Sequence, residues 1–330
     1  MDMTFAENRE IDFAQAARVL AQSMEIREDW DETKTREAFL NSSYAVSIRD
    51  GNRTAAVGRA ISDNYAWTLI TDVAVLPEYR EQGIGGKLLE RIKERFRGHE
   101  LFTYTYASHI PFFEAHGFKR SRNSFTYAGE KDEAIDPRLL GKGFFLPAGY
   151  RFESEYAPPA DGRFPTGRKS TLDRDSVKLS FTEQREELNY TRLNELLSLA
   201  FGGRERDPEV TRTTFENSRY AEFALDGEKL IGCARAESDG ISQGFILNVA
   251  VDPAYQGLHI GREITSRLSA QMKGQNIFLN THPGGVGFYN REGFRRNKTA
   301  MLYPAHPDMP EETAKGFVLP RGYRFENEMT

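Results

Sequence analysis

The chain has 330 residues but only one cysteine, Cys233, and this scarcity excludes an intrachain disulfide. The sequence also lacks the Cys/His spacings of a metal-ligand set, so we expect no metal cofactor. Cys233 stands in a strand-like apolar stretch, Lys229-Leu230-Ile231-Gly232-Cys233-Ala234. We interpret it as a small buried apolar residue and not as a nucleophile, because free cysteine is among the most often buried residue types.

Long apolar runs are lacking too, since none approaches the roughly 20 residues needed to span a bilayer. The first residues have neither the basic start nor the apolar run of a signal peptide. Basic residues form no run or stripe: 44 Lys and Arg stand against 49 Asp and Glu, which gives a net charge of −5. These absences argue against nucleic-acid and membrane partners and predict a reduced, cytoplasmic protein.

What the sequence does contain is a repeat with a constant offset of 176 residues, as between Arg59 and Arg235. Residues 73–87 read as a strand, a turn at a proline, a glycine-bearing loop and an amphipathic helix, and residues 249–262 repeat this pattern. The repeat predicts two homologous domains, 1–156 and 177–330. Residues 157–176 between them are rich in Pro, Gly and polar residues and are predicted to be a linker.

Each half shows the same order of predicted elements: a short strand, a helix, a strand pair around Asp-Gly, the strand–loop–helix unit, another strand and a short helix. We expect each half to close with a strand of its own, through residues 125–127 or 301–303. A second repeat, at 142–153 and 315–326, alternates aromatic residues and predicts a last strand docked on the sheet. The alternation of strands and helices indicates an α/β fold class.

The glycine loop that opens onto a helix is a candidate anion site. The first N–H groups of a helix lack partners within it, and the positive end of the helix dipole points at the same place. Glycine allows a phosphate group to come close to this backbone. The sequence thus predicts a phosphorylated ligand at one loop or at both.

The order Val-x-Val, Pro, x-x-Gly-x-Gly, a strand and then Phe-Tyr-x-x-x-Gly-Phe resembles that of the GCN5-related N-acetyltransferases (GNAT), and the resemblance extends over both halves. It implies two tandem GNAT-like domains, each with a mixed α+β sheet that is splayed at its centre and flanked by helices. It also implies that acetyl-coenzyme A is a cosubstrate that lies in the gap of the sheet, with its pyrophosphate on the loop.

The resemblance assigns cofactor-binding residues to both halves. In the first half the strand contributes backbone groups for the pantetheine arm and the loop wraps the pyrophosphate, through Val73, Val75, Arg80, Gln82, Gly83, Gly85, Gly86 and Lys87. The corresponding residues of the second half are Val249, Val251, Gln256, Gly257, His259, Gly261 and Arg262. His259 stands where the first half has Gly83; its side chain crowds the phosphate, although its N–H remains available and an imidazolium could help.

The two halves differ at the residue expected to protonate the departing thiolate. In the family a tyrosine commonly does this, and Tyr289 occupies that position in the second half. The first half has Phe113 there, and a phenyl ring cannot donate a proton. The alternative interpretation of Tyr289 is an aromatic ring packed against Phe288 and Phe294.

Acetyl transfer also needs a neutral amine and a polarised carbonyl. Backbone N–H groups near Val75 or Val251 can polarise the carbonyl. The candidate bases are Asp72 in the first half and His282 or Asp239 in the second.

The role of Asp72 is not repeated in the second half, because Asp72 corresponds to Asn248, which cannot act as a base. His282 can equally be a turn residue before Pro283. Asp63 and Asp239 both end an Arg-Ala-x-Ser-Asp stretch and read more simply as turn acceptors.

The sequence thus predicts an N-acetyltransferase that moves an acetyl group from acetyl-coenzyme A to a primary amine, by direct attack in a ternary complex. A small-molecule amine is favoured over a peptide or protein amine. Tyr289 and His282 favour the second half for the chemistry, while an active first half that uses Asp72 and water is the close alternative. A coenzyme A-responsive binding or regulatory protein without turnover remains a further alternative. The linker would permit the halves to pack as a pseudo-dimer.

Overall fold

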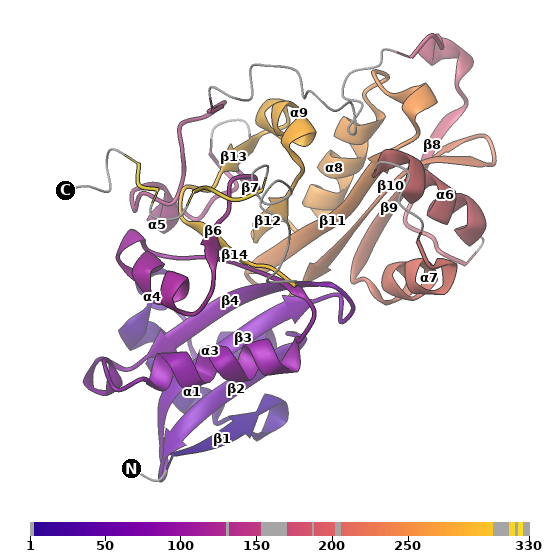
Figure 1. Cartoon of the computed structure of the whole chain (residues 1–330). Helices are drawn as coiled ribbons and strands as arrows, with labels where there is room; N and C mark the ends of the chain where they lie inside the picture. The colour runs from indigo at the N-terminus through magenta and orange to yellow at the C-terminus, as the bar shows by residue number, and fades with distance from the viewer. Residues whose placement is uncertain are drawn as a thin grey trace.

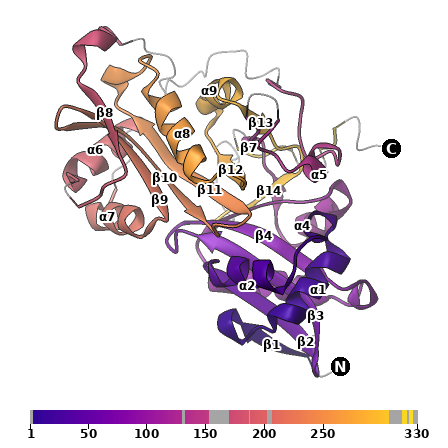
Figure 2. The same cartoon turned by 180° about the vertical axis from the view of Figure 1, so that it is seen from behind.

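The computed structural model describes residues 3–129, 132–152, 170–186, 188–201, 206–305, 317–320 and 323–325. These residues form two similar halves, each built on a mixed seven-stranded sheet flanked by helices (Figure 1 and Figure 2). This confirms the predicted fold class. Residues 157–169 of the predicted linker lie outside the described residues, and the predicted domain limits stay a prediction.

The first sheet has the strand order β1-β2-β3-β4-β5-β14-β6. Its strands are β1 (Met3–Glu7), β2 (Tyr44–Asp50), β3 (Arg53–Ser62), β4 (Trp67–Val75), β5 (Glu100–Tyr104), β14 (Ala300–Tyr303) and β6 (Lys119–Arg120). The pair β4 and β5 is parallel, whereas the other neighbours are antiparallel.

The second sheet has the order β13-β7-β12-β11-β10-β9-β8. Its strands are β13 (Phe294–Arg296), β7 (Ser124–Tyr127), β12 (Asn276–Asn280), β11 (Gln243–Val251), β10 (Lys229–Ser238), β9 (Tyr220–Asp226) and β8 (Leu179–Thr182). Here β11 and β12 form the parallel pair.

Helices cover both faces of each sheet. The helices of the described residues are α1 (Phe13–Ser23), α2 (Glu32–Leu40), α3 (Ile84–Arg95), α4 (Ile110–Ala115), α5 (Pro137–Leu140), α6 (Tyr190–Ala200), α7 (Pro208–Asn217), α8 (Ile260–Gln271) and α9 (Val286–Arg291). In the first half α1 and α2 lie on one face and α3 and α4 on the other, and α6, α7, α8 and α9 repeat this arrangement. The apolar spacing explains the pairing, because the predicted faces of α3 and α8 are buried. No helix within the described ranges is long and apolar enough to cross a bilayer.

The two halves exchange their closing strands, and the prediction that each half closes with its own strand was wrong. Strand β7 pairs with β12 and β13 of the second sheet, while β14 pairs with β5 and β6 of the first. Figure 1 shows β7 among the strands of the second half and β14 beside β6. The two closing strands occupy equivalent positions of the repeat, so the local sequence did not indicate which sheet each strand joins.

The aromatic repeats were predicted to form last strands, and this was also wrong for the described residues. They make only single bridges, Phe145 to Asn297 and Ser121 to Val318. Instead the two repeats meet each other: the ring of Phe152 lies 6.3 Å from that of Phe325 and 6.4 Å from that of Tyr323. The aromatic alternation therefore reflects contact between the halves.

An apolar cluster joins the two sheets where they meet. The Phe102 ring of β5 lies 5.7 Å from Phe245 of β11 and 6.0 Å from Phe278 of β12. All three rings are buried. Burial on this scale contributes about 2 kcal/mol per side chain, so the halves are held by a shared core as well as by strand exchange.

Buried Glu222 interrupts the otherwise apolar β9 and faces α8. Only 2% of its surface is exposed. Gln271 Nε2 donates a 3.2 Å hydrogen bond to it, and Arg267 Nε lies 4.0 Å away. Burial raises the pKa of Glu222 to about 7, partly offset by Arg267 and reinforced by Glu183 and Glu263.

Glu222→Gln is therefore expected to stabilise the protein increasingly as pH rises. The folded-state pKa exceeds the ordinary glutamate pKa of 4.5, so the stability that protonated Glu222 contributes is full below that pH and is lost as pH rises through about 7. The gain of the variant over the parent protein should grow by roughly 2 kcal/mol between acidic and mildly alkaline pH. Urea unfolding at pH 5 and pH 8 measures it, with exposed Glu228→Gln as the control; equal effects of the two variants would contradict the assignment.

Candidate functional site

In each half the central parallel pair of strands diverges and leaves one strand edge open. β4 pairs with β5 only from Trp67 to Leu69, and its remaining residues to Val75 have no partner strand on that side among the described residues. In the second half β11 pairs with β12 only as far as Ile246. The predicted splayed sheet is therefore present in both halves. An open edge of this kind can hydrogen-bond an extended ligand as a neighbouring strand would.

The open edge of each half leads to a helix start with the same backbone geometry. Gly83 precedes α3 with φ +75°, and His259 precedes α8 with φ +63°. Neither helix has a side-chain hydrogen bond at its N-cap, so the first-turn N–H groups point outward toward a possible anion. His259 thus keeps the left-handed conformation of the glycine that it replaces.

His259→Gly is expected to raise stability, since a non-glycine residue in the left-handed region costs about 1 kcal/mol. The matched Gly83→Ala should lower stability by a similar amount, because no atom lies within 4 Å of the added Cβ and only the backbone conformation opposes it. Denaturant unfolding of both variants measures the effect. A less stable His259→Gly variant would show that the imidazole makes a compensating interaction.

In each half one loop side chain hydrogen-bonds the carbonyl oxygen of the last residue of the open strand. Arg80 Nε donates to the carbonyl oxygen of Val75 at 3.2 Å, and Gln256 Nε2 donates to that of Val251 at 3.3 Å. The predicted loop residues of each half are thus brought together. In the first half Gln82, Gly83 and Lys87 are exposed and available to a ligand.

Gly85 and Gly261 each face an aromatic ring, which the sequence did not indicate. A Cβ at Gly85 would lie 3.4 Å from the ring of Phe112, and one at Gly261 would lie 3.4 Å from the ring of Phe288. A Cβ at either position would therefore just touch the facing ring.

A cavity of about 450 Å³ opens at the start of α8. Two guanidinium groups and an imidazole line it, from Arg174, His259 and Arg262, together with Glu263 and Ser266. Arg262 also pairs with the Glu292 carboxylate at 3.3 Å. Arg174 comes from the far end of the predicted linker, and no motif pointed to it. The two guanidinium groups are suitable partners for a phosphate group, and Glu263 and Glu292 offset part of their charge.

Tyr289 lies in α9 with 7% of its surface exposed, and burial raises its pKa. Its ring lies 5.3 Å from Phe294 at an interplanar angle of 77°. Phe113 makes the same contact with Phe118, also at 5.3 Å and 77°. The two rings thus have equivalent aromatic contacts. The sites differ there by the hydroxyl group and by Phe125, 6.0 Å from Tyr289, where the repeat places Met301 in the first half. Both interpretations of Tyr289, ring packing and proton donation, are compatible with this position.

His282 follows β12, next to the opening of the second sheet. Burial lowers its pKa to about 4, so the imidazole is neutral at pH 7. A neutral ring can accept a hydrogen bond, but it is a weaker base than free histidine.

Asp72 lies between two arginines with 1% of its surface exposed. Arg27 Nε donates to one carboxylate oxygen at 3.0 Å, and Arg59 Nε donates to the other. Burial alone would raise the pKa of Asp72, but the charges of Arg27 and Arg59 outweigh it and lower the pKa. These contacts favour a structural role and make Asp72 a poor proton acceptor at neutral pH.

The space beside Asp72 is filled by protein. The guanidinium of Arg27 stacks 4.3 Å from the centroid of the Trp30 ring, and both side chains are buried. The segment 25–32 packs in part against α5: Ile26 is buried beside Leu139, and Arg138 pairs with Asp29 at 2.9 Å. An acceptor molecule therefore has little room next to the first open edge.

Asp63 and Asp239 are turn acceptors, as the sequence suggested. One oxygen of each accepts three backbone N–H groups, from residues 65–67 and 241–243 respectively. The other oxygen crosses to the opposite half: Arg235 donates to Asp63 at 2.7 Å, and Arg59 donates to Asp239 at 2.6 Å. Asp239 is thus engaged at both oxygens, which argues against its use as a base.

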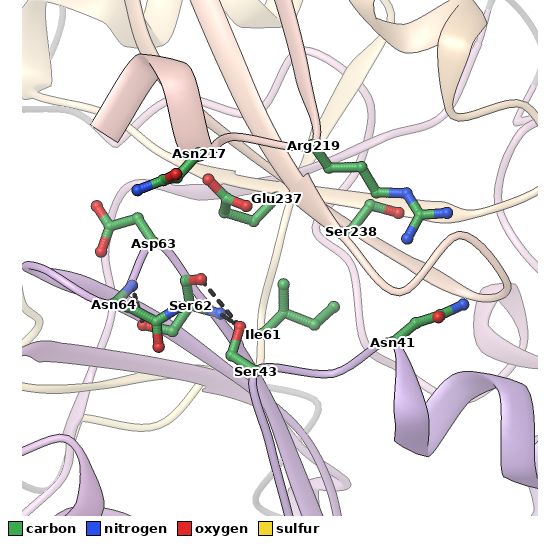
Figure 3. A pocket seen from close by; sticks show the side chains of 10 residues that line it. All are labelled: Asn41, Ser43, Ile61, Ser62, Asp63, Asn64, Asn217, Arg219, Glu237 and Ser238. Carbon is green, nitrogen blue, oxygen red and sulfur yellow. Dashed lines mark hydrogen bonds between the residues drawn. The ribbon is translucent and has the colours of Figure 1, made fainter. Parts of the chain in front are cut away.

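The halves also meet at a polar pocket of about 210 Å³. Figure 3 shows its walls, with Asn41, Ser62 and Asp63 from the first half facing Asn217, Glu237 and Ser238 from the second. Asn41 and Ser62 correspond to Asn217 and Ser238 through the repeat offset, so the pocket lies on the axis that relates the halves.

Cys233 lies in the core of the second half and exposes no surface. Burial raises its pKa to about 12, so the thiol stays protonated. This confirms the interpretation of Cys233 as a buried apolar residue.

Two splayed sheets, each with a glycine-type loop at a helix start, define a tandem acyltransferase fold. The family model described as "Acetyltransferase (GNAT) domain" matches residues 41–120 and 218–296. The chain belongs to the GCN5-related N-acetyltransferase superfamily, with two such domains in tandem. The two matched regions repeat with nearly the offset seen in the sequence.

Named relatives and a solved structure agree with this family. The chain is 32% identical to serotonin N-acetyltransferase 2, chloroplastic, of Oryza sativa, over 33% of this chain and 58% of the rice protein. It is 32% identical to GCN5-related N-acetyltransferase 1, chloroplastic, of Arabidopsis thaliana, over 38% of this chain and 66% of that protein. The chain therefore spans less than two thirds of the length of these relatives. A GCN5-related N-acetyltransferase from Sphaerobacter thermophilus has a similar fold, with TM-score 0.50 and 15% identity over 90% of this chain and 94% of its own.

Proposed function

We propose that the protein transfers an acetyl group from acetyl-coenzyme A to a primary amine and that the second half carries out the reaction. The observation that carries this proposal is the pair Tyr289 and Phe113. Their rings have equivalent aromatic contacts, and only the second half provides a proton donor there. The cationic cavity at the start of α8 supports the same assignment, because it lies where the phosphates of the cosubstrate would bind.

Acetyl-coenzyme A supplies the acetyl group as a thioester, and the residues of the chain bind and orient it. The first-turn N–H groups of α8 and the side chains of Arg174 and Arg262 would hold the phosphates. The open edge of β11 would hydrogen-bond the pantetheine arm, and a backbone N–H of that edge would polarise the carbonyl. The amine nitrogen attacks this carbon, and the C–S bond breaks.

Two proton transfers accompany these bond changes. Tyr289 gives its phenolic proton to the departing sulfur; its raised pKa keeps the phenol protonated at neutral pH. The attacking amine loses its proton to water, with the neutral imidazole of His282 as hydrogen-bond acceptor. Asp72 takes no part as a base in this scheme.

The acceptor is proposed to be a small molecule with a primary amino group. The rice relative is named for serotonin, which is such an amine. A peptide or protein amine is the alternative acceptor. The cytoplasmic location predicted from the sequence stays a prediction.

The first half is proposed to bind coenzyme A or acetyl-coenzyme A without turnover. Its glycine loop is complete, but Phe113 offers no proton and Arg27 and Trp30 occupy the space beside Asp72. The alternative of a binding or regulatory protein is thus favoured for this half alone. The exchanged strands and the reciprocal ion pairs support the further proposal that the halves form a pseudo-dimer.

Release of free thiol from acetyl-coenzyme A, measured with a panel of amines, tests the function. The panel contains serotonin, aliphatic mono- and polyamines, and peptides with free amino termini. Turnover with a small amine and not with peptides is the expected result. Binding of acetyl-coenzyme A without turnover for any member of the panel would overturn the enzyme proposal and leave the binding role.

A further inference from the structure

We infer that the first half completes the reaction site of the second: Asp63 fixes Arg235, and Arg235 holds Asn248 in the bulge of β11 beside the reacting thioester. The inference rests on the proposed function. It makes Asp63 and Arg235 positioning residues that act through the backbone of β11.

Arg235 uses all three guanidinium nitrogens, with 2% of the residue exposed. Nε donates to Asn248 Oδ1 at 2.6 Å, and Nη2 donates to Asp63 Oδ2 of the other half at 2.7 Å. Nη1 donates to Glu237 at 3.3 Å and to Ser218 at 3.2 Å. A guanidinium held in this way cannot turn without losing a charge-assisted hydrogen bond.

Asp63 is a rigid anchor for this group. Its Oδ1 accepts the N–H groups of Tyr65, Ala66 and Trp67 at 2.9–3.0 Å. Burial would raise the pKa of Asp63, but the Arg235 charge and these N–H groups outweigh it and lower the pKa. The first half thus presents a fixed, ionised carboxylate to the second.

The series of contacts from Asp63 through Arg235 ends at Asn248. It has φ +54°, in the left-handed region, and lies in a bulge between the pairs Arg235–Leu247 and Cys233–Ala250. A bulge interrupts the ladder and re-aims the backbone groups of its strand. This bulge comes just after Ile246, where β11 parts from β12.

The bulge lies where the reacting end of the cosubstrate is expected. At about 3.3 Å per residue, the stretch from Val251 back to Leu247 spans roughly 13 Å of open edge. With the phosphates at the start of α8, an extended arm along this edge places its far end next to Asn248. The N–H groups here would then face the carbonyl oxygen.

The first half has an equivalent series of contacts, but it ends at Asp72 where the second half has Asn248. Arg59 donates to Asp239 at 2.6 Å and also to Asp72. Asp72 has no positive φ, and Arg27 holds it as well. Loss of Asp239 therefore leaves Asp72 anchored, whereas loss of Asp63 loosens the arginine that Asn248 contacts.

This difference provides a matched pair of variants, Asp63→Asn and Asp239→Asn. Each leaves its arginine with one other carboxylate, so similar losses of thermal stability are expected. With Asp63→Asn we expect kcat to fall about tenfold or more while the KM for acetyl-coenzyme A stays within twofold, because the phosphate site is remote. With Asp239→Asn kcat should stay within twofold. Asp63→Glu should recover part of the loss.

Hydrogen exchange separates this inference from the proposed function. Amides of residues 247–249 should exchange faster in Asp63→Asn than in Asp239→Asn, whether or not any amine is turned over. Equal exchange in the two variants would overturn the inference. A kcat loss that follows the loss of stability equally in both would also overturn it. Absence of turnover in the parent protein, with faster exchange in Asp63→Asn, would count against the proposed function alone.

Discussion

Tyr289→Phe is expected to lower kcat by about 10²–10⁴-fold, the usual contribution of a positioned general acid. The KM for acetyl-coenzyme A should change little, because the open edge of β11 and the cationic cavity supply the binding. The substitution is structurally mild: Phe113 already occupies the equivalent position of the first half with the same ring contact. A lost proton donor, and not a disturbed core, would therefore explain the lower rate.

The matched control for this variant is Phe113→Tyr. It adds a hydroxyl group at the equivalent position of the first half, where Asp72 is tied to two arginines. We expect no gain in turnover from Phe113→Tyr in a Tyr289→Phe background. Steady-state kinetics with saturating amine decide the matter. An unchanged kcat for Tyr289→Phe would show that Tyr289 is only a packing residue. Either the first half would then carry out the reaction, or water would protonate the thiolate.

His259→Glu is expected to abolish cosubstrate binding at the second loop and, with it, turnover. The new carboxylate would stand at the start of α8, facing the phosphate position. Two like charges about 4 Å apart repel by roughly 4 kcal/mol at an effective dielectric constant of 20, which corresponds to about a thousandfold in affinity. His259→Gln, with a neutral side chain of the same length, separates this charge effect from loss of the imidazole.

Gly83→Glu is the corresponding change in the first half. A Cβ there meets no atom within 4 Å, so the side chain fits and acts through its charge and backbone conformation. Native mass spectrometry or calorimetry counts the bound coenzyme A molecules. Each variant should lose one bound molecule, and only His259→Glu should also lose turnover. Loss of turnover in Gly83→Glu with retention in His259→Glu would place the chemistry in the first half.

Local patterns predicted most of the elements. The apolar spacing of α3 and α8 and the Asp-Gly turns after β2 and β9 depend on residues close in sequence. The splayed sheet was also predictable, from the resemblance. The repeat strengthened these predictions, because the same pattern of residues occurs in both halves.

Contacts between residues distant in the sequence were not predictable in the same way. Asp72 looked like a free carboxylate beside the reacting strand, but Arg27 and Arg59, distant in sequence, neutralise it. Arg174 belonged to no motif, yet it lines the cavity at the second loop. In both cases the decisive neighbour lies many residues away, and no local spacing encodes it.

The sequence by itself determined the duplication, most of the secondary structure and the differences between the halves, such as Tyr289 against Phe113, because periodicity and residue chemistry are local properties. The tertiary structure alone decided that β7 and β14 change places and that Asp63 and Asp239 reach across to arginines of the opposite half. Two homologous halves present the same pattern to either edge, so only their packing selects the partner. That selection ties the backbone of the second site to a carboxylate of the first half.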